Sequence, residues 1–285
     1  MNGLKKLLLF AAALLLLTGC GAKSGMEQPE SRQETGKTLY TTVVHYSGED
    51  DDKKYLQIAE RSQKLFPLLE EHLGAFVVNA YNFQNEGGEP LYTLNTLHYP
   101  AEIDPYGKCI EVSKNYFSYF PVETADGSDM ETQLSADENT LDLLVSEHFR
   151  EKEADILSAY RDAFYFEKVT AFNEYNQSAG RSERSALTSE DLSVHIIYVK
   201  DGQRYFVPGS NCITEDGGWL TEPIVKVYDA AKVHCNYAHS NLSQWTYFYA
   251  DTPNAEDAFS LLLPDVKACG AEESFQKVSL AERQP

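Results

Sequence analysis

The sequence predicts an α+β fold with mixed sheets and two long helices. Short runs rich in β-branched and aromatic residues, typical of strands, alternate with two long segments whose apolar residues recur every three or four positions, as in amphipathic helices. The 285-residue chain is 42% hydrophobic and 12% aromatic, which is enough for a packed core. Its formal net charge of −20 argues against nucleic acid and anionic lipid as partners, because both require Lys and Arg.

The first residues predict a lipoprotein signal peptide over residues 1–19. Lys5 and Lys6 precede an apolar run, residues 7–17, that is too short to span a bilayer but has the length of a signal-peptide core. The run leads into Thr18-Gly19-Cys20, which is similar to a bacterial lipobox, so we expect Cys20 to carry the lipid. An ordinary secreted protein or a short membrane anchor is the alternative.

A tether and a single large domain are expected after the signal peptide. Residues 20–37 are small and polar and predict a flexible tether, and residues 38–285 predict an extracytoplasmic α+β domain. No segment of this domain reaches the roughly 18 apolar residues of a membrane span. We therefore expect an extracytoplasmic protein that is lipid-anchored to the cell membrane, on a Gram-positive surface or in a periplasm.

The first part of the domain predicts a strand–helix–strand unit. Residues 38–46 and 75–83 have the composition of strands, and residues 55–73 carry their apolar side chains on one helical face. Pro67 is expected to kink or split this helix, and Gly74 is expected to end it.

The remaining elements follow from the same patterns. Further strands are expected at residues 91–99, 108–112, 140–145, 192–199, 204–207, 224–228 and 244–249. A second long helix is expected over residues 147–175, and a short helix over residues 256–263 is expected to stop at Pro264. Asp201-Gly202 predicts a hairpin turn. The polar segment 121–138 is where two lobes of the domain would divide.

Four cysteines lie in the domain, Cys109, Cys212, Cys235 and Cys269. An even number outside the cytoplasm is typical of two disulfides. Cys212 with Cys235 is the preferred pair, because both lie in one loop-rich stretch. Buried free thiols are the alternative, because a large core does not need disulfides for stability.

The nearest approach to a catalytic motif contains His234, Cys235 and His239. A Cys beside a His can act as a thiolate nucleophile, but neighbours on a strand point to opposite faces. We therefore expect His234 to be poorly placed to activate Cys235. The same residues with Cys212 match no common zinc spacing. The prediction is a protein that is not an enzyme, with no catalytic residue, no metal and no cofactor.

Acidic and aromatic residues suggest binding surfaces instead. Acidic residues cluster at 49–52, 126–131 and 215–216, and none of these clusters has EF-hand spacing. We expect solvated loops whose charge attracts a cationic peptide. Most of the 18 Tyr and 14 Phe lie in strand patterns, so we expect them in the core, with an exposed aromatic platform for sugars or peptides as the alternative.

Four segments carry a resemblance to a known family. They are residues 110–117 (IEVSKNYF), 138–145 (ENTLDLLV), 196–206 (IIYVKDGQRYF) and 222–227 (EPIVKV). Their order resembles the extracytoplasmic domain of bacterial ABC-transporter permeases of the FtsX/MacB type, and more closely that of bacteriocin-associated integral membrane proteins, which are described as immunity proteins. Transmembrane helices flank the domain in those permeases and are not found here, so transport itself does not carry over.

The resemblance implies a non-catalytic interaction or sensing ectodomain associated with an ABC-type export or antimicrobial-peptide-resistance system. Its partners would be an integral membrane transporter and a cationic peptide. One alternative is a solute-binding lipoprotein of an ABC importer, which requires two α/β lobes around a hinged cleft. Another is an extracytoplasmic thiol or metal hydrolase that uses the region of Cys235.

Overall fold

The structure is a computed structural model that describes residues 36–45 and 51–285. All of these residues belong to one compact unit. Its fold is α+β with a large mixed sheet and several helices, as the sequence predicts. The predicted signal peptide, most of the predicted tether, Cys20 and Tyr46 lie outside the described residues.

Eight strands form the central sheet in the order β12-β1-β11-β2-β5-β10-β6-β7. They are β1 (Thr38–Val44), β2 (Phe76–Asn79), β5 (Cys109–Ser113), β6 (Thr140–Ser146), β7 (Ser193–Val199), β10 (Ile224–Tyr228), β11 (Thr246–Ala250) and β12 (Phe275–Leu280). Strands β5 and β10 are parallel, as are β6 and β7, and the other neighbours are antiparallel. The two small hairpins are β3 (Asn85–Glu86) with β4 (Glu89–Pro90) and β8 (Arg204–Phe206) with β9 (Trp219–Thr221).

Helices and single helical turns connect the strands. The α-helices are α1 (Asp52–Leu73), α2 (Tyr116–Tyr119), α3 (Met130–Gln133), α4 (Glu153–Tyr165), α5 (Ala171–Ser178), α6 (Cys235–Gln244) and α7 (Ala255–Ala268). The 3₁₀ turns are η1 (Tyr81–Phe83), η2 (Leu91–Leu94), η3 (Glu147–Lys152) and η5 (Ser189–Asp191), and a π-helical turn, η4 (Phe166–Thr170), joins α4 to α5. The predicted long helix over residues 147–175 is therefore a succession of η3, α4, η4 and α5.

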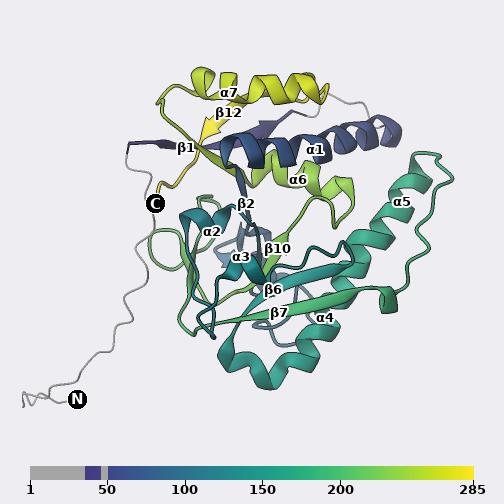
Figure 1. Ribbon diagram of the computed structural model, residues 1–285, viewed down its shortest axis with the longest axis vertical. Coiled ribbons are helices and arrows are strands. Elements are labelled where there is room, and N and C mark those ends of the chain that lie inside the picture. Colours follow the sequence, from purple (N-terminus) through teal and green to yellow (C-terminus); the bar gives the residue numbers. More distant parts are fainter. Residues whose placement is uncertain (1–35, 46–50) are drawn as a thin grey trace, which may run out of the picture. The chain divides into compact units, whose positions relative to one another are not determined.

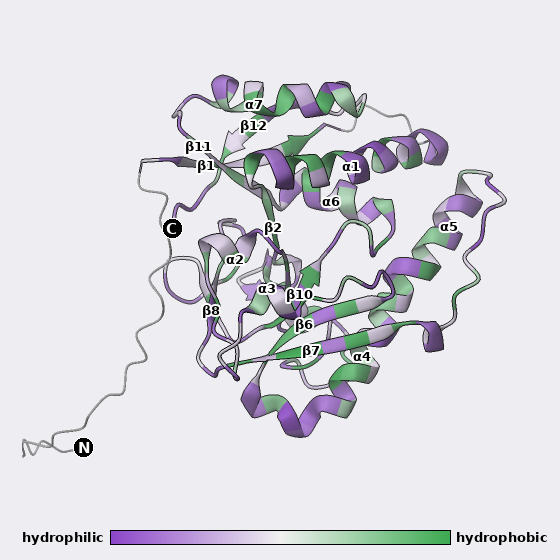
Figure 2. Cartoon of the chain, in the orientation of Figure 1, coloured by the Kyte–Doolittle hydropathy of each residue, from purple (hydrophilic) through white to green (hydrophobic). Residues whose placement is uncertain are grey.

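The long helices gather on one face of the sheet (Figure 1). Helix α1 packs on α6, α6 lies on β1, and α7 lies on β12. Phe66 of α1 also contacts Tyr228 of β10, with 5.3 Å between ring centroids. Figure 2 shows the helices as alternating green and purple, the pattern of an apolar face turned to the sheet and a polar face turned to water.

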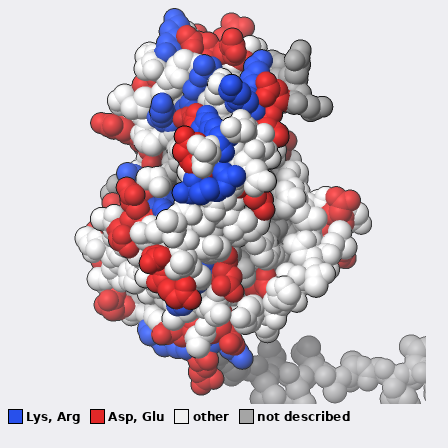
Figure 3. All heavy atoms as spheres, turned by 90° about the vertical axis from the view of Figure 1, so that its right-hand side faces the viewer, with Lys and Arg blue, Asp and Glu red and all other residues white. Residues whose placement is uncertain are grey.

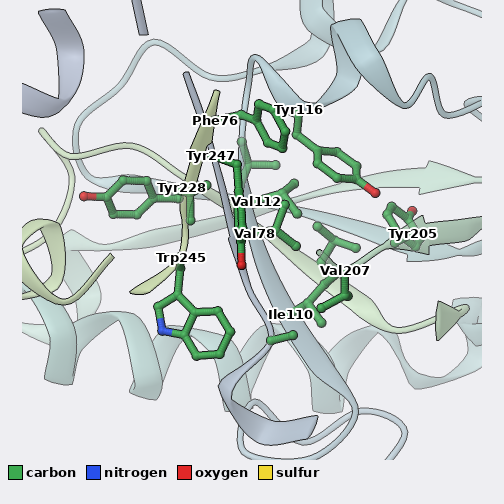
Figure 4. Close-up of a cluster of buried hydrophobic side chains, with 14 of the residues drawn as sticks. Phe76, Val78, Ile110, Val112, Tyr116, Tyr205, Val207, Tyr228, Trp245 and Tyr247 are labelled. Carbon is green, nitrogen blue, oxygen red and sulfur yellow. The ribbon is translucent and has the colours of Figure 1, made fainter. Parts of the chain in front are cut away.

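The opposite face of the sheet holds a tightly packed aromatic core. Figure 4 shows Tyr116 and Tyr205 on one side of the central strands and Tyr228 on the other. The Tyr116 hydroxyl accepts a hydrogen bond from the backbone N–H of Phe206 at 2.7 Å, and both side chains are fully buried. This contact fixes the small β8–β9 hairpin against the central sheet.

Helix α1 begins and ends where its sequence signals indicate. Asp51 caps the N-terminus by accepting a hydrogen bond from the backbone N–H of Lys53, and Gly74 ends the helix in a left-handed conformation, with φ of 63°. The helix continues through Pro67, so the expected split does not occur. Its buried face offsets the lost backbone hydrogen bond; the buried residues are Leu56, Ile58, Ala59, Ser62, Leu65, Phe66 and Leu69.

One predicted strand and one predicted hairpin are wrong. Residues 91–99 form η2 and a loop, where Pro90 and the polar residues that follow favour turns. Asp201-Gly202 is a turn, but the expected hairpin does not form, because β7 pairs with β6 and β8 pairs with β9. The polar segment 121–138 runs between β5 and β6, which both neighbour β10 in the sheet.

Three further differences concern the C-terminal part of the chain. The segment around His234 and Cys235 begins helix α6, although the sequence suggests a strand there. Pro264 lies inside α7 and does not end it. Strand β12 was not predicted, because its residues FQKVSL alternate only weakly between apolar and polar side chains.

Candidate functional site

An open pocket of about 550 Å³ lies where β2 ends and β5 begins, beside β10. Asn79 pairs in register with Glu111, and Glu111 pairs in register with Lys226. Side chains at paired positions share a face of the sheet, so these three polar side chains form one row across three neighbouring strands. That face is the one covered by the long helices.

A buried ionic cluster forms the floor of the pocket. Lys226 donates a hydrogen bond to Glu167, and its ammonium nitrogen lies 3.5 Å from Oε1 of Glu111. These three side chains are only 11–14% exposed. With both carboxyl groups ionised, two carboxylates and one ammonium give the cluster a net charge of −1. One oxygen of the cluster, Oε2 of Glu167, is buried and has no hydrogen-bond partner among the described residues.

Burial and charge act in opposite directions on this cluster. Burial raises the pKa of Glu167, and the carboxylate of Glu111 raises it further, while the ammonium of Lys226 opposes both. Burial alone would lower the pKa of Lys226, but Glu167 and Glu111 raise it above its ordinary value. Lys226 is therefore fixed as a cation.

Neighbouring elements hold the two glutamates in place. Glu167 lies on the π-helical turn η4, a kind of turn frequent at functional sites. Asn241 of α6 donates to Oε2 of Glu111 at 3.4 Å and accepts from Asn79 at 2.9 Å. Residues of the central sheet, of α6 and of the turn between α4 and α5 therefore hold the cluster in position.

Aromatic side chains line the pocket above this floor: Tyr81, Tyr106, Tyr237 and Trp245. Tyr81 is 56% exposed and Tyr106 is 49% exposed, so both rings are accessible to a ligand. The pKa of Tyr106 and that of Tyr237 are raised, first by burial and then by the charge of Glu167. Both rings therefore lie within electrostatic reach of the ionic cluster.

The loop that carries Tyr106 is held rigidly. Buried Asp104 accepts the backbone N–H of Tyr106 at 2.9 Å, and Asn95 donates to the carbonyl of Tyr106 at 3.0 Å. The next residue is Gly107, where a Cβ atom would lie 2.2 Å from the carbonyl oxygen of Ala101. Only glycine fits this close approach of two backbone segments.

All four cysteines of the described domain are free thiols, so the preferred Cys212–Cys235 disulfide is absent. The two thiols lie against different elements: Sγ of Cys212 is 3.5 Å from the carbonyl oxygen of Ala80, and Cys235 begins α6. Burial raises the pKa of Cys109, Cys212 and Cys235 to about 12. Cys269 is half-buried.

His234 and Cys235 are closer than strand geometry would allow. Because both lie at the start of a helix, Nε2 of His234 is 3.6 Å from Sγ of Cys235, and Nδ1 of His234 is 2.6 Å from Oδ1 of Asn236. The thiol lines a cavity of about 490 Å³ but is 4% exposed. Its raised pKa keeps it protonated near neutral pH, so this contact does not produce an activated thiolate.

The four residues considered for zinc, Cys212, His234, Cys235 and His239, do not form one of the ligand groups found among the described residues. Cys212 lies apart from Cys235, and Nδ1 of His239 contacts the hydroxyl of Ser62 at 3.1 Å. In the part of the chain that the structure describes, one other group brings three ligand types together: His148, Asp201 and Glu222. Its side chains are partly exposed and hydrogen-bond to one another and to the backbone.

The acidic clusters serve local turns. Asp126 accepts hydrogen bonds from the backbone N–H and the hydroxyl of Ser128, which lower its pKa. Asp129 caps α3, and Glu215 accepts hydrogen bonds from Thr221. Figure 3 shows acidic side chains spread over one face of the molecule, with basic side chains in its upper and middle parts and along its lower edge.

The pocket residues were not predicted as a site, although a signal was present. Glu111 and Lys226 stand at the centres of the strand segments CIEVS and IVKVY, where a charged side chain must find a buried partner. Glu167, Tyr106 and Tyr237 carry no such signal, because they reach the pocket only through the packing of α4, α6 and a loop.

No known family model, curated protein or solved structure matches this chain. Each helix in the described ranges is too short or too polar to span a lipid bilayer.

Proposed function

We propose that this protein is a non-catalytic, membrane-anchored binding protein that holds a small ligand, or one side chain of a peptide, in the pocket above the Lys226 cluster. The observation that carries the proposal is the combination, in one open pocket, of a buried ionic floor and partly exposed aromatic walls. Binding sites typically unite an apolar lining with a few fixed polar groups.

The remainder of the proposal comes from the sequence. The lipobox around Cys20 supports a lipid anchor and an extracytoplasmic location. The resemblance to FtsX/MacB-type ectodomains supports association with an ABC-type exporter of an antimicrobial-peptide-resistance or bacteriocin-immunity system. In that setting the domain would bind a peptide and present its occupancy to an integral membrane transporter.

A ligand panel tests the binding function. Wild-type protein is screened by thermal shift against a neutral sugar, a neutral peptide, an anionic peptide and a cationic peptide. We expect one class to raise the melting temperature. The shift should disappear in Tyr106→Ala and persist in Phe166→Ala, a similarly exposed aromatic residue that does not line this pocket. Absence of any shift, or a shift that survives in Tyr106→Ala, would overturn the proposal.

A separate experiment tests the partner. The full chain carrying a C-terminal tag is cross-linked in native membranes, captured and identified by mass spectrometry. Recovery of an exporter permease with its ATPase supports the accessory role. Recovery of an importer permease would favour the solute-binding alternative, and recovery of neither would reject an association with transporters.

A further inference from the structure

We infer that the pocket recognises a cationic group, an alkylammonium or guanidinium. This inference rests on the proposed binding function and adds the chemical class of the ligand. Its basis is the unpaired oxygen of Glu167 in a negatively charged cluster beneath four aromatic side chains.

The charge of the pocket favours a cationic ligand. The ionisable groups with carboxylate or ammonium side chains in the pocket are Glu111, Glu167 and Lys226. The single ammonium is shared between the two carboxylates, so one negative charge is left uncompensated. A buried carboxylate oxygen without a partner is costly. Oε2 of Glu167 has less than 1 Å² of accessible surface, so a ligand N–H would form a charge-assisted hydrogen bond with it once the side chain turns toward the pocket.

The aromatic lining of the pocket also favours a cation. A cation over the face of a Tyr or Trp ring is attracted by the ring electrons, and the attraction is stronger where water is excluded. Tyr106, Tyr237 and Glu167 line the same pocket, so a cation bound there lies near both aromatic rings and the carboxylate. An anionic ligand would be repelled by the cluster, and a neutral donor would pair with the Glu167 oxygen but leave the negative charge uncompensated.

The aromatic walls of the pocket are held in a fixed geometry. The backbone of Tyr106 is held on both sides, by Asp104 and by Asn95, and Tyr237 is part of α6. Little ordering is needed when a ligand enters, so the interaction free energy is available for affinity.

The test uses the fluorescence of Trp245, which lines the pocket. Trp219 is the only other tryptophan in the sequence, so Trp219→Phe isolates the signal. The probes are a blocked tri-lysine peptide, its Nε-acetylated counterpart, a blocked tri-glutamate peptide and spermidine. We expect tri-lysine to bind at least about tenfold more tightly than the acetylated peptide, the factor that one charge-assisted contact provides. Spermidine distinguishes a free amine from a peptide side chain as the source of the cation.

A matched pair of variants separates the pocket from the general negative charge of the protein. Glu167→Gln and Glu174→Gln each remove one negative charge, but Glu174 is exposed and lies outside this pocket. We expect Glu167→Gln to weaken tri-lysine binding about tenfold or more and Glu174→Gln to change it less than about twofold. Circular dichroism checks that both variants fold, and Tyr106→Ala provides a second pocket variant whose change is at an exposed position.

Three outcomes overturn the inference. They are equal binding of tri-lysine and its acetylated form, equal effects of the two glutamate variants, and no binding of either cationic probe. If the acetylated peptide binds as tightly as tri-lysine and Tyr106→Ala abolishes its binding, the ligand class is wrong while the proposed binding function stands. If Tyr106→Ala changes no binding of any probe, both fail.

Discussion

Glu70 is a partly buried acid on α1, away from the pocket, and it gives a prediction about pH. Its pKa is raised to about 7, chiefly by burial and also by Asp229, while Lys114 and Ser113 oppose the rise. Its Oε1 has no hydrogen-bond partner among the described residues. The folded state therefore holds this proton more tightly than the unfolded state does. The free energy of unfolding should fall as the pH rises from about 4.5 toward about 7.

Replacing this acid with its amide should remove that loss. We expect Glu70→Gln to match wild type near pH 4 and to exceed it at pH 8 by on the order of 2 kcal/mol, measured by urea unfolding. Glu71→Gln, at the exposed neighbouring position, is the control and should show no such pH-dependent gain. A constant difference between Glu70→Gln and wild type across this range would contradict the assignment.

At the level of single residues, part of the site could be read from the sequence. The charges of Glu111 and Lys226 inside apolar strands demand partners, and the strand register supplies them. Glu167 could not be assigned to the same cluster, because its position depends on a π-helical turn that no apolar periodicity encodes. The prediction that His234 and Cys235 point to opposite faces is wrong for a similar reason, because these residues begin a short helix and not a strand.

Among the elements, α1 offers a prediction at its C-terminal end. A Cβ atom on Gly74 would lie 2.6 Å from the hydroxyl of Tyr119, and its φ is left-handed. Gly74→Ala should lower the free energy of unfolding by about 1–2 kcal/mol for the backbone alone, and more if Tyr119 must move. Gly127→Ala has a similar φ with nothing within 4 Å, so the difference between the two variants measures the contact.

The β8–β9 hairpin offers another prediction. Its backbone at Phe206 is joined to the core through the hydroxyl of Tyr116. Tyr116→Phe leaves this buried N–H unpaired and should cost about 1–3 kcal/mol in thermal or urea unfolding. The same change at exposed Tyr81 should cost little. Equal effects at the two positions would show that the hydroxyl contact contributes nothing.

Long and strongly patterned elements were predictable, and those fixed by partners far along the chain were not. β1, α1, β6, β7 and β10 agree with their sequence patterns to within a few residues. Strand β12 and the separation of β8 from β7 depend on pairing with distant segments. Local propensity carries no information on such pairing.

For the molecule as a whole, the edge strand β12 contributes to stability by closing one side of the central sheet and packing against the core. It pairs with β1 and buries Val278 against the core. Val278→Asp places an unpaired charge in the core and should cost several kcal/mol, seen as a large fall in the urea midpoint. Gln276→Asp adds the same charge at an exposed position of this strand and should change stability by less than about 0.5 kcal/mol. A similar loss for both would mean that net charge, and not burial, is responsible.

The pairing of β1 also affects the order in which the sheet can form during synthesis. During synthesis β1 is among the first strands made, yet both of its neighbours, β11 and β12, come near the other end of the described chain. Thr41 accordingly bonds to Thr246, 205 residues further along. The pairs β2–β5 and β6–β7 join strands that lie much closer along the chain, and β10, which lies between β5 and β6, is made before β11. This half of the sheet can therefore nucleate first, while β1 waits as an unpaired, β-prone segment until the final strands appear.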